Sequence, residues 1–122
     1  MSATAGSRGL HHLLLQSTDL ERSERFFLDF LGFTVRSRGE FTDGRPLTVT
    51  HEGLGLTSGG PGTAGAVEHI AFRASNIREI ARRAHEEGVA VYKDVGPGVY
   101  GLAVYLGDPD GNRIELFAED ET

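Results

Sequence analysis

The chain has 122 residues, enough for one domain with a modest hydrophobic core. Hydrophobic residues make up 39% of it and charged residues 25%, a composition typical of folded globular proteins and too apolar for a disordered chain. The 12 basic and 18 acidic side chains give a formal charge of -6 without a basic cluster, so nucleic acid is not an expected partner. The absence of cysteine excludes disulfides and thiolate chemistry, and any metal must bind to His, Asp or Glu.

Residues 1–9 contain no basic segment followed by an apolar stretch, and no apolar run approaches the roughly 18–20 residues of a membrane span. We therefore expect a cytoplasmic protein with no membrane partner. Its predicted organisation is a flexible tail over 1–9, one domain over 10–119 and a short tail over 120–122.

The first half of the domain, 10–58, is predicted to hold one helix and four strands. Asp19 is suited to cap a helix over 20–31, and Gly32 ends it. Apolar runs bounded by turn residues predict strands over 10–16, 33–38, 47–51 and 54–58.

A glycine-rich segment, 59–65, is the predicted linker, and the same order of elements recurs in 66–119. Asn76 and Gly88 bound the predicted second helix, 77–87. The predicted strands are 67–74, 89–92, 102–106 and 113–117. Shifting the first half by 57 residues aligns the first strands and helices, and a shift of 60 aligns the last strands. The repeat predicts an α+β fold of two βαβββ modules.

Alternation along the strands singles out three side chains. His12 lies opposite the aliphatic face of the first strand, His69 occupies the matching position in the second half, and Glu115 points the same way from the last strand. Two imidazoles and a carboxylate are a common ligand set for a divalent transition metal. Each of these residues taken singly also suits an exposed sheet position, but the repeat-related histidines favour a shared site.

Three segments carry a family resemblance. They are Leu10 to Ser23 with the following Phe26-Phe27 and Leu31-Gly32-Phe33, Glu68 to Phe72, and Tyr105 to Leu116. The chain resembles the vicinal oxygen chelate superfamily, which contains glyoxalase I, fosfomycin thiol transferases, extradiol dioxygenases and bleomycin-resistance proteins. The resemblance implies that the two modules form a partly closed mixed β-sheet around a metal and substrate cleft, usually completed in a homodimer.

The resemblance also implies metal ligation by His12, His69 and Glu115. Of the two adjacent histidines, His12 has the family's spacing to Asp19, and His11 is expected to face solvent. A dimer would draw His12 from one chain and His69 with Glu115 from the other.

The chain departs from each branch of this superfamily. The acid or glutamine that glyoxalase-like proteins carry in the first module is replaced by Gly55, unless Glu52 or His51 takes its place. Leu14 stands where fosfomycin transferases carry a polar residue. The histidine of the dioxygenase signature is missing near Tyr100. Bleomycin-resistance proteins lack the ligand set that this chain retains.

The sequence thus predicts a small metal-dependent enzyme that binds an oxygen-bearing small molecule. Oxygenase or dioxygenase chemistry ranks first, because three protein ligands leave room for substrate and oxygen. A glyoxalase-type lyase or isomerase, a thiol transferase and a non-catalytic antibiotic-binding protein are the alternatives. Fe(II) or Mn(II) is the favoured metal, with Ni(II) or Zn(II) possible, and Tyr105 and Arg73 are the predicted substrate contacts.

Overall fold

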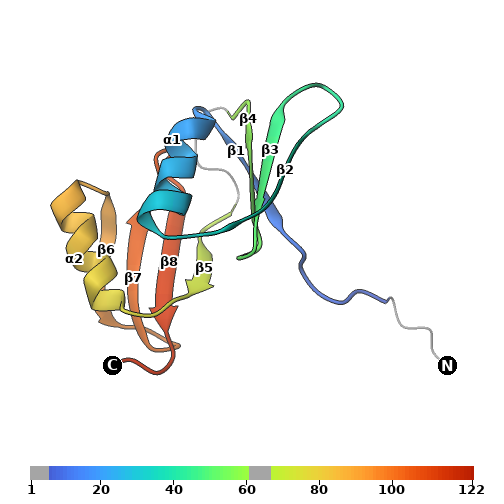
Figure 1. Cartoon of the computed structure of the whole chain (residues 1–122). Coiled ribbons are helices and arrows are strands. Elements are labelled where there is room, and N and C mark those ends of the chain that lie inside the picture. Colours follow the sequence, from blue (N-terminus) through green and yellow to red (C-terminus); the bar gives the residue numbers. More distant parts are fainter. Residues whose placement is uncertain (1–5, 61–66) are drawn as a thin grey trace.

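The first module contains one helical segment and four strands, in the order that the sequence predicts (Figure 1). The computed structural model describes residues 6–60 and 67–122, so residues 1–5 of the predicted tail and 61–65 of the predicted linker lie outside the described part. The elements are β1 (Leu13–Ser17), α1 (Leu20–Glu24), the π-helical turn η1 (Arg25–Phe30), β2 (Val35–Glu40), β3 (Pro46–Thr50) and β4 (Leu54–Ser58).

The predicted first helix is observed as α1 continued by η1. The Asp19 side chain accepts a hydrogen bond from the Arg22 backbone N–H at 3.2 Å, which caps the helix as expected. Past the end of η1, Gly32 adopts a positive φ of 78°, which glycine adopts without steric cost. The wider η1 turn buries Phe26, Phe27 and Phe30 together against the core.

The second module repeats this order and confirms the predicted internal repeat. It consists of β5 (Ile70–Arg73), α2 (Ile77–Glu87), β6 (Val91–Pro97), β7 (Leu102–Gly107) and β8 (Arg113–Ala118).

The start of α2 differs from the prediction in how it is capped. Asn76 has a left-handed backbone with φ of 58°, and its side chain forms no capping hydrogen bond. The Glu121 carboxylate instead accepts from the backbone N–H groups of Asn76 at 2.9 Å and Ile77 at 3.1 Å. A carboxylate from the end of the chain therefore satisfies the free donors of the helix.

The strands form two four-stranded mixed sheets, with orders β1-β4-β3-β2 and β5-β8-β7-β6. The α+β class is therefore confirmed. Within residues 6–60 and 67–122 no strand pairing joins the two sheets, so they do not close into one sheet. In the central parallel pairs, Leu14 lies beside Gly55 in the first sheet and Ala71 lies beside Glu115 in the second. Gly55 therefore occupies the first-module counterpart of Glu115.

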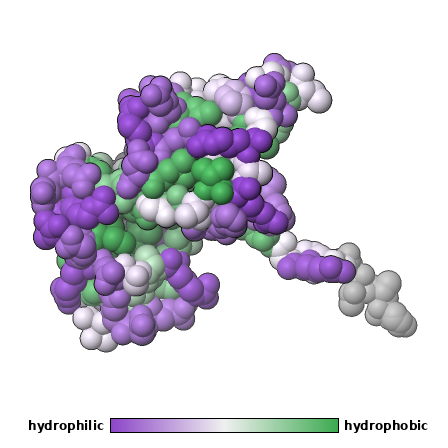
Figure 2. All heavy atoms as spheres, viewed as in Figure 1, coloured by the Kyte–Doolittle hydropathy of each residue, from purple (hydrophilic) through white to green (hydrophobic). Residues whose placement is uncertain are grey.

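One hydrophobic core lies between the modules. Its fully buried side chains include Phe27, Leu54, Ile77, Leu106 and Ile114, which come from both halves of the chain. Hydrophilic residues cover the outer sides of the two helices, and hydrophobic residues show between them (Figure 2). Among the described helices, none is long and apolar enough to cross a membrane.

A polar contact also links the modules. The Asp110 carboxylate, in the turn between β7 and β8, accepts hydrogen bonds from the Thr18 backbone N–H at 3.2 Å and from Thr18 Oγ1 at 2.6 Å. Arg22 Nη2 lies 3.6 Å from the same carboxylate, whose side chain is only 7% exposed. This contact fixes the start of α1 against the second module.

Candidate functional site

The second sheet brings together two of the three predicted metal ligands. Glu115 lies in the middle of β8, between Ala71 of β5 and Tyr105 of β7, and its side chain is 7% exposed. His69 directly precedes β5, and its Nε2 atom is 3.2 Å from Glu115 Oε1. A buried carboxylate and an imidazole nitrogen thus converge on one point, as the alternation of side chains predicts.

Tyr105 lies beside this pair. Its ring is 5.6 Å from the His69 ring, centroid to centroid, in an edge-to-face arrangement. Partial burial, a hydrogen bond with Glu115 and the negative charges of Glu115 and Glu68 raise the pKa of Tyr105 above its ordinary value. The phenol therefore remains protonated at neutral pH and can donate a hydrogen bond to a ligand oxygen.

Two adjoining cavities extend from His69 across the sheet. One, of about 260 Å³, is lined by Glu68, His69, Tyr92, Lys93, Tyr105 and Arg113. The other, of about 320 Å³, is lined by Lys93, Gly96, Pro97, Gly98, Val99, Ala103 and Tyr105. Lys93 and Tyr105 border both, so an ammonium and a phenol stand between a polar compartment and a more apolar one.

A salt-bridged group surrounds His69 on its other side. Glu68 Oε1 is within hydrogen-bond distance of His69 Nδ1, and Arg113 Nη1 is 3.3 Å from Glu68 Oε2. The hydrogen bond from His69 lowers the pKa of Glu68, and the charge of Arg113 lowers it further. Glu68 is therefore ionised at neutral pH.

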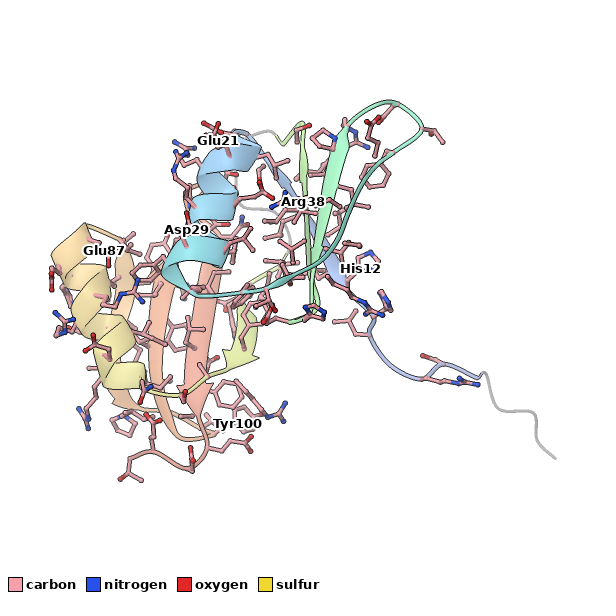
Figure 3. The ribbon with its side chains drawn as sticks, in the orientation of Figure 1. His12, Glu21, Asp29, Arg38, Glu87 and Tyr100 are labelled. Carbon is pink, nitrogen blue, oxygen red and sulfur yellow. The ribbon has the colours of Figure 1, made fainter. Side chains whose placement is uncertain are left out.

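The third predicted ligand lies in the other module. His12 is exposed and directly precedes β1, where its Nδ1 atom is 2.7 Å from His11 Nδ1 (Figure 3). Within the described residues of one chain, no group of three or more His, Asp and Glu side chains is placed to hold a metal ion. His11 is exposed, as expected, and its Nε2 atom lies 3.4 Å from Arg36 Nη1.

Gly55 leaves room for the His12 ring. A Cβ atom built at position 55 would lie 3.4 Å from His12 Cδ2 and 3.1 Å from Leu14 Cδ1. Glu52 and His51, the two residues that could replace a side chain at position 55, both contact Thr34. The Glu52 carboxylate accepts a hydrogen bond from the Thr34 backbone N–H at 3.1 Å, and His51 Nδ1 is 3.1 Å from Thr34 Oγ1. The first module therefore offers His12 without an adjacent carboxylate at position 55.

Arg73 has a different environment from the one expected of a substrate contact. Its side chain is 79% exposed, and its Nε atom donates to Glu119 Oε1 at 2.7 Å. The cavity that it borders, of about 240 Å³, lies beside Phe33, Ala74 and Ile80 and does not include His69. The cavity at His69 is bordered instead by two other cations, Lys93 and Arg113, which the sequence reasoning missed.

Glu68 was also missed as a site residue. An acidic residue directly before a candidate ligand histidine was the available signal for it. Lys93 had no comparable signal, because its place beside Tyr105 depends on the irregular register between β6 and β7.

The residues around His69 have complementary chemical abilities. His69 and Glu115 offer one nitrogen and one carboxylate to a cation, the donor types that first-row divalent metals accept. Tyr105 offers a neutral hydrogen-bond donor, and Lys93 offers a positive charge to an anionic group. The arrangement suits a small, oxygen-bearing, anionic molecule.

Known proteins match most of the chain. A family model described as the Glyoxalase/Bleomycin resistance protein/Dioxygenase superfamily matches residues 9–116. The lactoylglutathione lyase of Neisseria meningitidis is 29% identical, over 88% of this chain and 88% of that protein. The glutathione transferase FosA of Serratia marcescens is 28% identical, over 89% of this chain and 79% of that protein. The solved structure of the trypanothione-dependent glyoxalase I of Leishmania major has a TM-score of 0.75 and 26% identity, covering 93% of this chain and 88% of that one.

Proposed function

Because the chain belongs to the glyoxalase, bleomycin resistance protein and dioxygenase superfamily, we propose that it is a divalent-metal-dependent enzyme that joins a thiol to an oxygen-bearing small substrate. The observation that carries this proposal is the contrast between Glu115 and its counterpart Gly55. The site has one buried carboxylate in place of two.

This contrast separates two kinds of chemistry. Isomerisation of a hemithioacetal moves a proton between neighbouring carbons and needs a base beside the substrate. Gly55 has no side chain to act as that base, and Glu52 is held by Thr34. Addition of a thiol does not require the removal of a carbon-bound proton. The sulfur forms a bond to carbon, a carbon–oxygen bond breaks, and the released oxygen takes the thiol proton.

The relatives support thiol chemistry over the oxygenase chemistry that the sequence ranked first. Their names are those of a lactoylglutathione lyase, a glutathione transferase and a trypanothione-dependent glyoxalase. All three names refer to a thiol compound or its adduct, and none refers to an oxygenase. We therefore place thiol transfer first and lyase chemistry second.

The proposed metal ligands are His69, Glu115 and, from a second copy of the chain, His12. The donors of the second module fit a divalent ion, because the buried Glu115 carboxylate lies 3.2 Å from an imidazole nitrogen. A bound Mn(II), Ni(II), Zn(II) or Fe(II) ion would polarise the substrate oxygens as a Lewis acid. Since one chain lacks a third nearby donor within its described residues, the proposed enzyme is a homodimer with a shared site.

The other site residues are proposed to orient the substrate. Lys93 pairs with an anionic group of the substrate, and the protonated Tyr105 donates to the oxygen on which negative charge develops. The cavity toward Gly98 and Val99 receives the less polar part.

The test compares three reactions in protein reconstituted with each metal. We expect glutathione to add to a small epoxide that bears an adjacent anionic group, and this activity to be lost with a chelator and in His69→Ala. Isomerisation of the methylglyoxal–glutathione hemithioacetal should be absent. Oxygen uptake with catechols would restore the oxygenase ranking, and tight ligand binding by metal-free protein without product would indicate a binding protein.

A further inference from the structure

We propose that the substrate carries an apolar substituent larger than a methyl group, such as a short alkyl chain or a phenyl ring, beside its anionic group. The substituent lies in the cavity of about 320 Å³ at the β6–β7 hairpin, which we call the apolar compartment. The size of the substituent is set by Gly96, Gly98 and Ala103. This inference rests on the proposed function, because it takes the site at His69 as the place of reaction.

Two neighbouring rows of side chains cross the second sheet on the face of the site. The first row is polar and consists of Lys93, Tyr105 and Glu115. The second row is small or apolar and consists of Gly96, Ala103 and Phe117. Residues two apart on a strand share a face and lie about 7 Å apart. A short substituent on a substrate held at the first row therefore reaches the second.

An irregularity in β6 brings Gly96 into the second row. Between the Lys93–Tyr105 pair and the Gly96–Ala103 pair, β6 advances from 93 to 96 and β7 only from 105 to 103. Such a bulge changes the direction of the side chains that follow it. A Cβ atom built at Gly96 would lie 3.9 Å from the Asp94 carbonyl oxygen, an ordinary contact distance. A side chain would therefore fit at position 96, and glycine leaves its volume to the apolar compartment.

Ala103 forms the floor of the apolar compartment. Its side chain is buried and shares a face with Tyr105, while Val104 between them belongs to the hydrophobic core. A Cβ atom built at Gly98 would lie only 3.1 Å from Ala103 Cβ and 3.0 Å from the Gly101 carbonyl oxygen. Small residues at positions 98 and 103 thus keep the hairpin from closing over the compartment.

The apolar compartment has the size and the lining for a ring or a short chain. Beyond Lys93 and Tyr105 at its border, it is lined by Gly96, Pro97, Gly98, Val99 and Ala103. Its volume of about 320 Å³ exceeds the roughly 150 Å³ of an apolar cavity that binds benzene. The Val99 side chain at the rim is 91% exposed, so an apolar occupant also removes this side chain from water.

Lys93 orients such a substrate. It borders both the apolar compartment and the cavity at His69, so a carboxylate paired with its ammonium lies at the boundary of the two. The substituent then points toward Ala103, and the oxygen that Tyr105 contacts lies toward His69. The substrate class is a small epoxy acid whose second epoxide carbon bears an alkyl or aryl group.

The first experiment measures the binding of butanoate and heptanoate to the dimeric protein without added metal, by NMR titration. Burial of one methylene strengthens binding by up to about fourfold, so heptanoate, with three more methylenes, should bind roughly 30–60-fold more tightly. Ala103→Leu fills the apolar compartment from its floor and should reduce this preference by about tenfold or more.

A second variant and a control make this result specific. Gly96→Val fills the compartment from β6 and should reduce the heptanoate preference in the same way, even if Ala103→Leu disturbs β7. Ala90→Leu adds the same side chain as Ala103→Leu at an exposed position between α2 and β6, and should keep the wild-type preference. Thermal unfolding checks that each variant is folded.

The second experiment measures kcat/KM for the addition of glutathione to glycidate and to 3-phenylglycidate, in dimeric protein reconstituted with metal. The intrinsic reactivities of the two epoxides are the same for every variant, so only the change in their ratio reports on the protein. We expect the ratio of the phenyl compound to glycidate to fall by about tenfold or more in Ala103→Leu and to stay unchanged in Ala90→Leu.

The outcomes separate this inference from the proposed function. If glutathione adds to the epoxides but neither variant changes the ratio, and heptanoate binds no more tightly than butanoate, the apolar compartment is refuted and the proposed function stands. A heptanoate preference that survives in both variants also refutes it, because the chain then binds elsewhere. If both variants remove the heptanoate preference but neither epoxide reacts with glutathione, thiol transfer fails and the compartment stands as a binding site.

Discussion

Replacing Asp110 with alanine should destabilise the protein markedly, because this carboxylate joins the two modules. It accepts from the Thr18 backbone N–H and from Thr18 Oγ1, and it is only 7% exposed. A hydrogen bond to a charged group contributes about 1.5–3 kcal/mol. The Thr18 N–H can be rehydrated in the variant, and the half-exposed Arg22 contributes at most about 1 kcal/mol. The expected loss is therefore about 2–4 kcal/mol, a large part of the ~5–15 kcal/mol that stabilises a typical domain.

Equilibrium urea unfolding, followed by circular dichroism at a fixed protomer concentration, measures this loss. With a slope of about 1–3 kcal/mol per molar urea, the midpoint should fall by roughly 0.7–4 M. Asp110→Asn retains one acceptor oxygen and should lose about half as much. Asp43→Ala, which removes an exposed turn carboxylate bound to Arg45, is the matched control and should leave the midpoint unchanged. A midpoint for Asp110→Ala equal to that of the control would refute the reasoning.

Three further predictions follow from the core, position 55 and the β7–β8 turn. Phe27→Ala should lower the free energy of unfolding by about 3–5 kcal/mol, since the ring is fully buried; a loss below 1 kcal/mol by urea unfolding would contradict this packing. Gly55→Glu should fold after a small shift of Leu14 and should gain hemithioacetal isomerisation, measured by absorbance; a folded variant without it would count against the role assigned to position 55. Burial raises the pKa of Asp108 above 3.8, so the folded state retains a proton that the unfolded state releases. The contribution of Asp108 to the free energy of unfolding should therefore decrease as pH rises from about 3.8 through the raised pKa, and Asp108→Asn should remove this contribution from the pH dependence measured by urea unfolding.

Local patterns were sufficient to predict most elements of this fold. The predicted α2 and β4 have the observed bounds, and Asp19 and Gly32 bound the first helix as expected. These features depend on residues close in sequence. Capping of α2 by Glu121 was not predictable in this way, because it depends on where the end of the chain packs. The separation of the two sheets likewise depends on long-range packing.

In the site, too, some features follow from local patterns and others depend on long-range packing. Alternation and the repeat were enough to bring His69 and Glu115 together, since parallel pairing of β5 and β8 follows from the module order. Arg73 lies on the predicted face of β5, two residues beyond Ala71, but its guanidinium pairs with Glu119 there. Lys93 enters the site through irregular pairing of β6 and β7, which no local pattern records.

The central claim is a metal site shared between two copies of the chain, and mixing two inactive variants tests it most directly. His12→Ala and Glu115→Ala should each lose tight metal binding as separate homodimers. After unfolding and refolding in an equal mixture, half of the dimers should be mixed, each with one intact site of two, which restores about a quarter of the wild-type metal content. Metal content measured by mass spectrometry should show this recovery. No recovery would contradict a shared site, because a site within one chain would remain defective in every molecule.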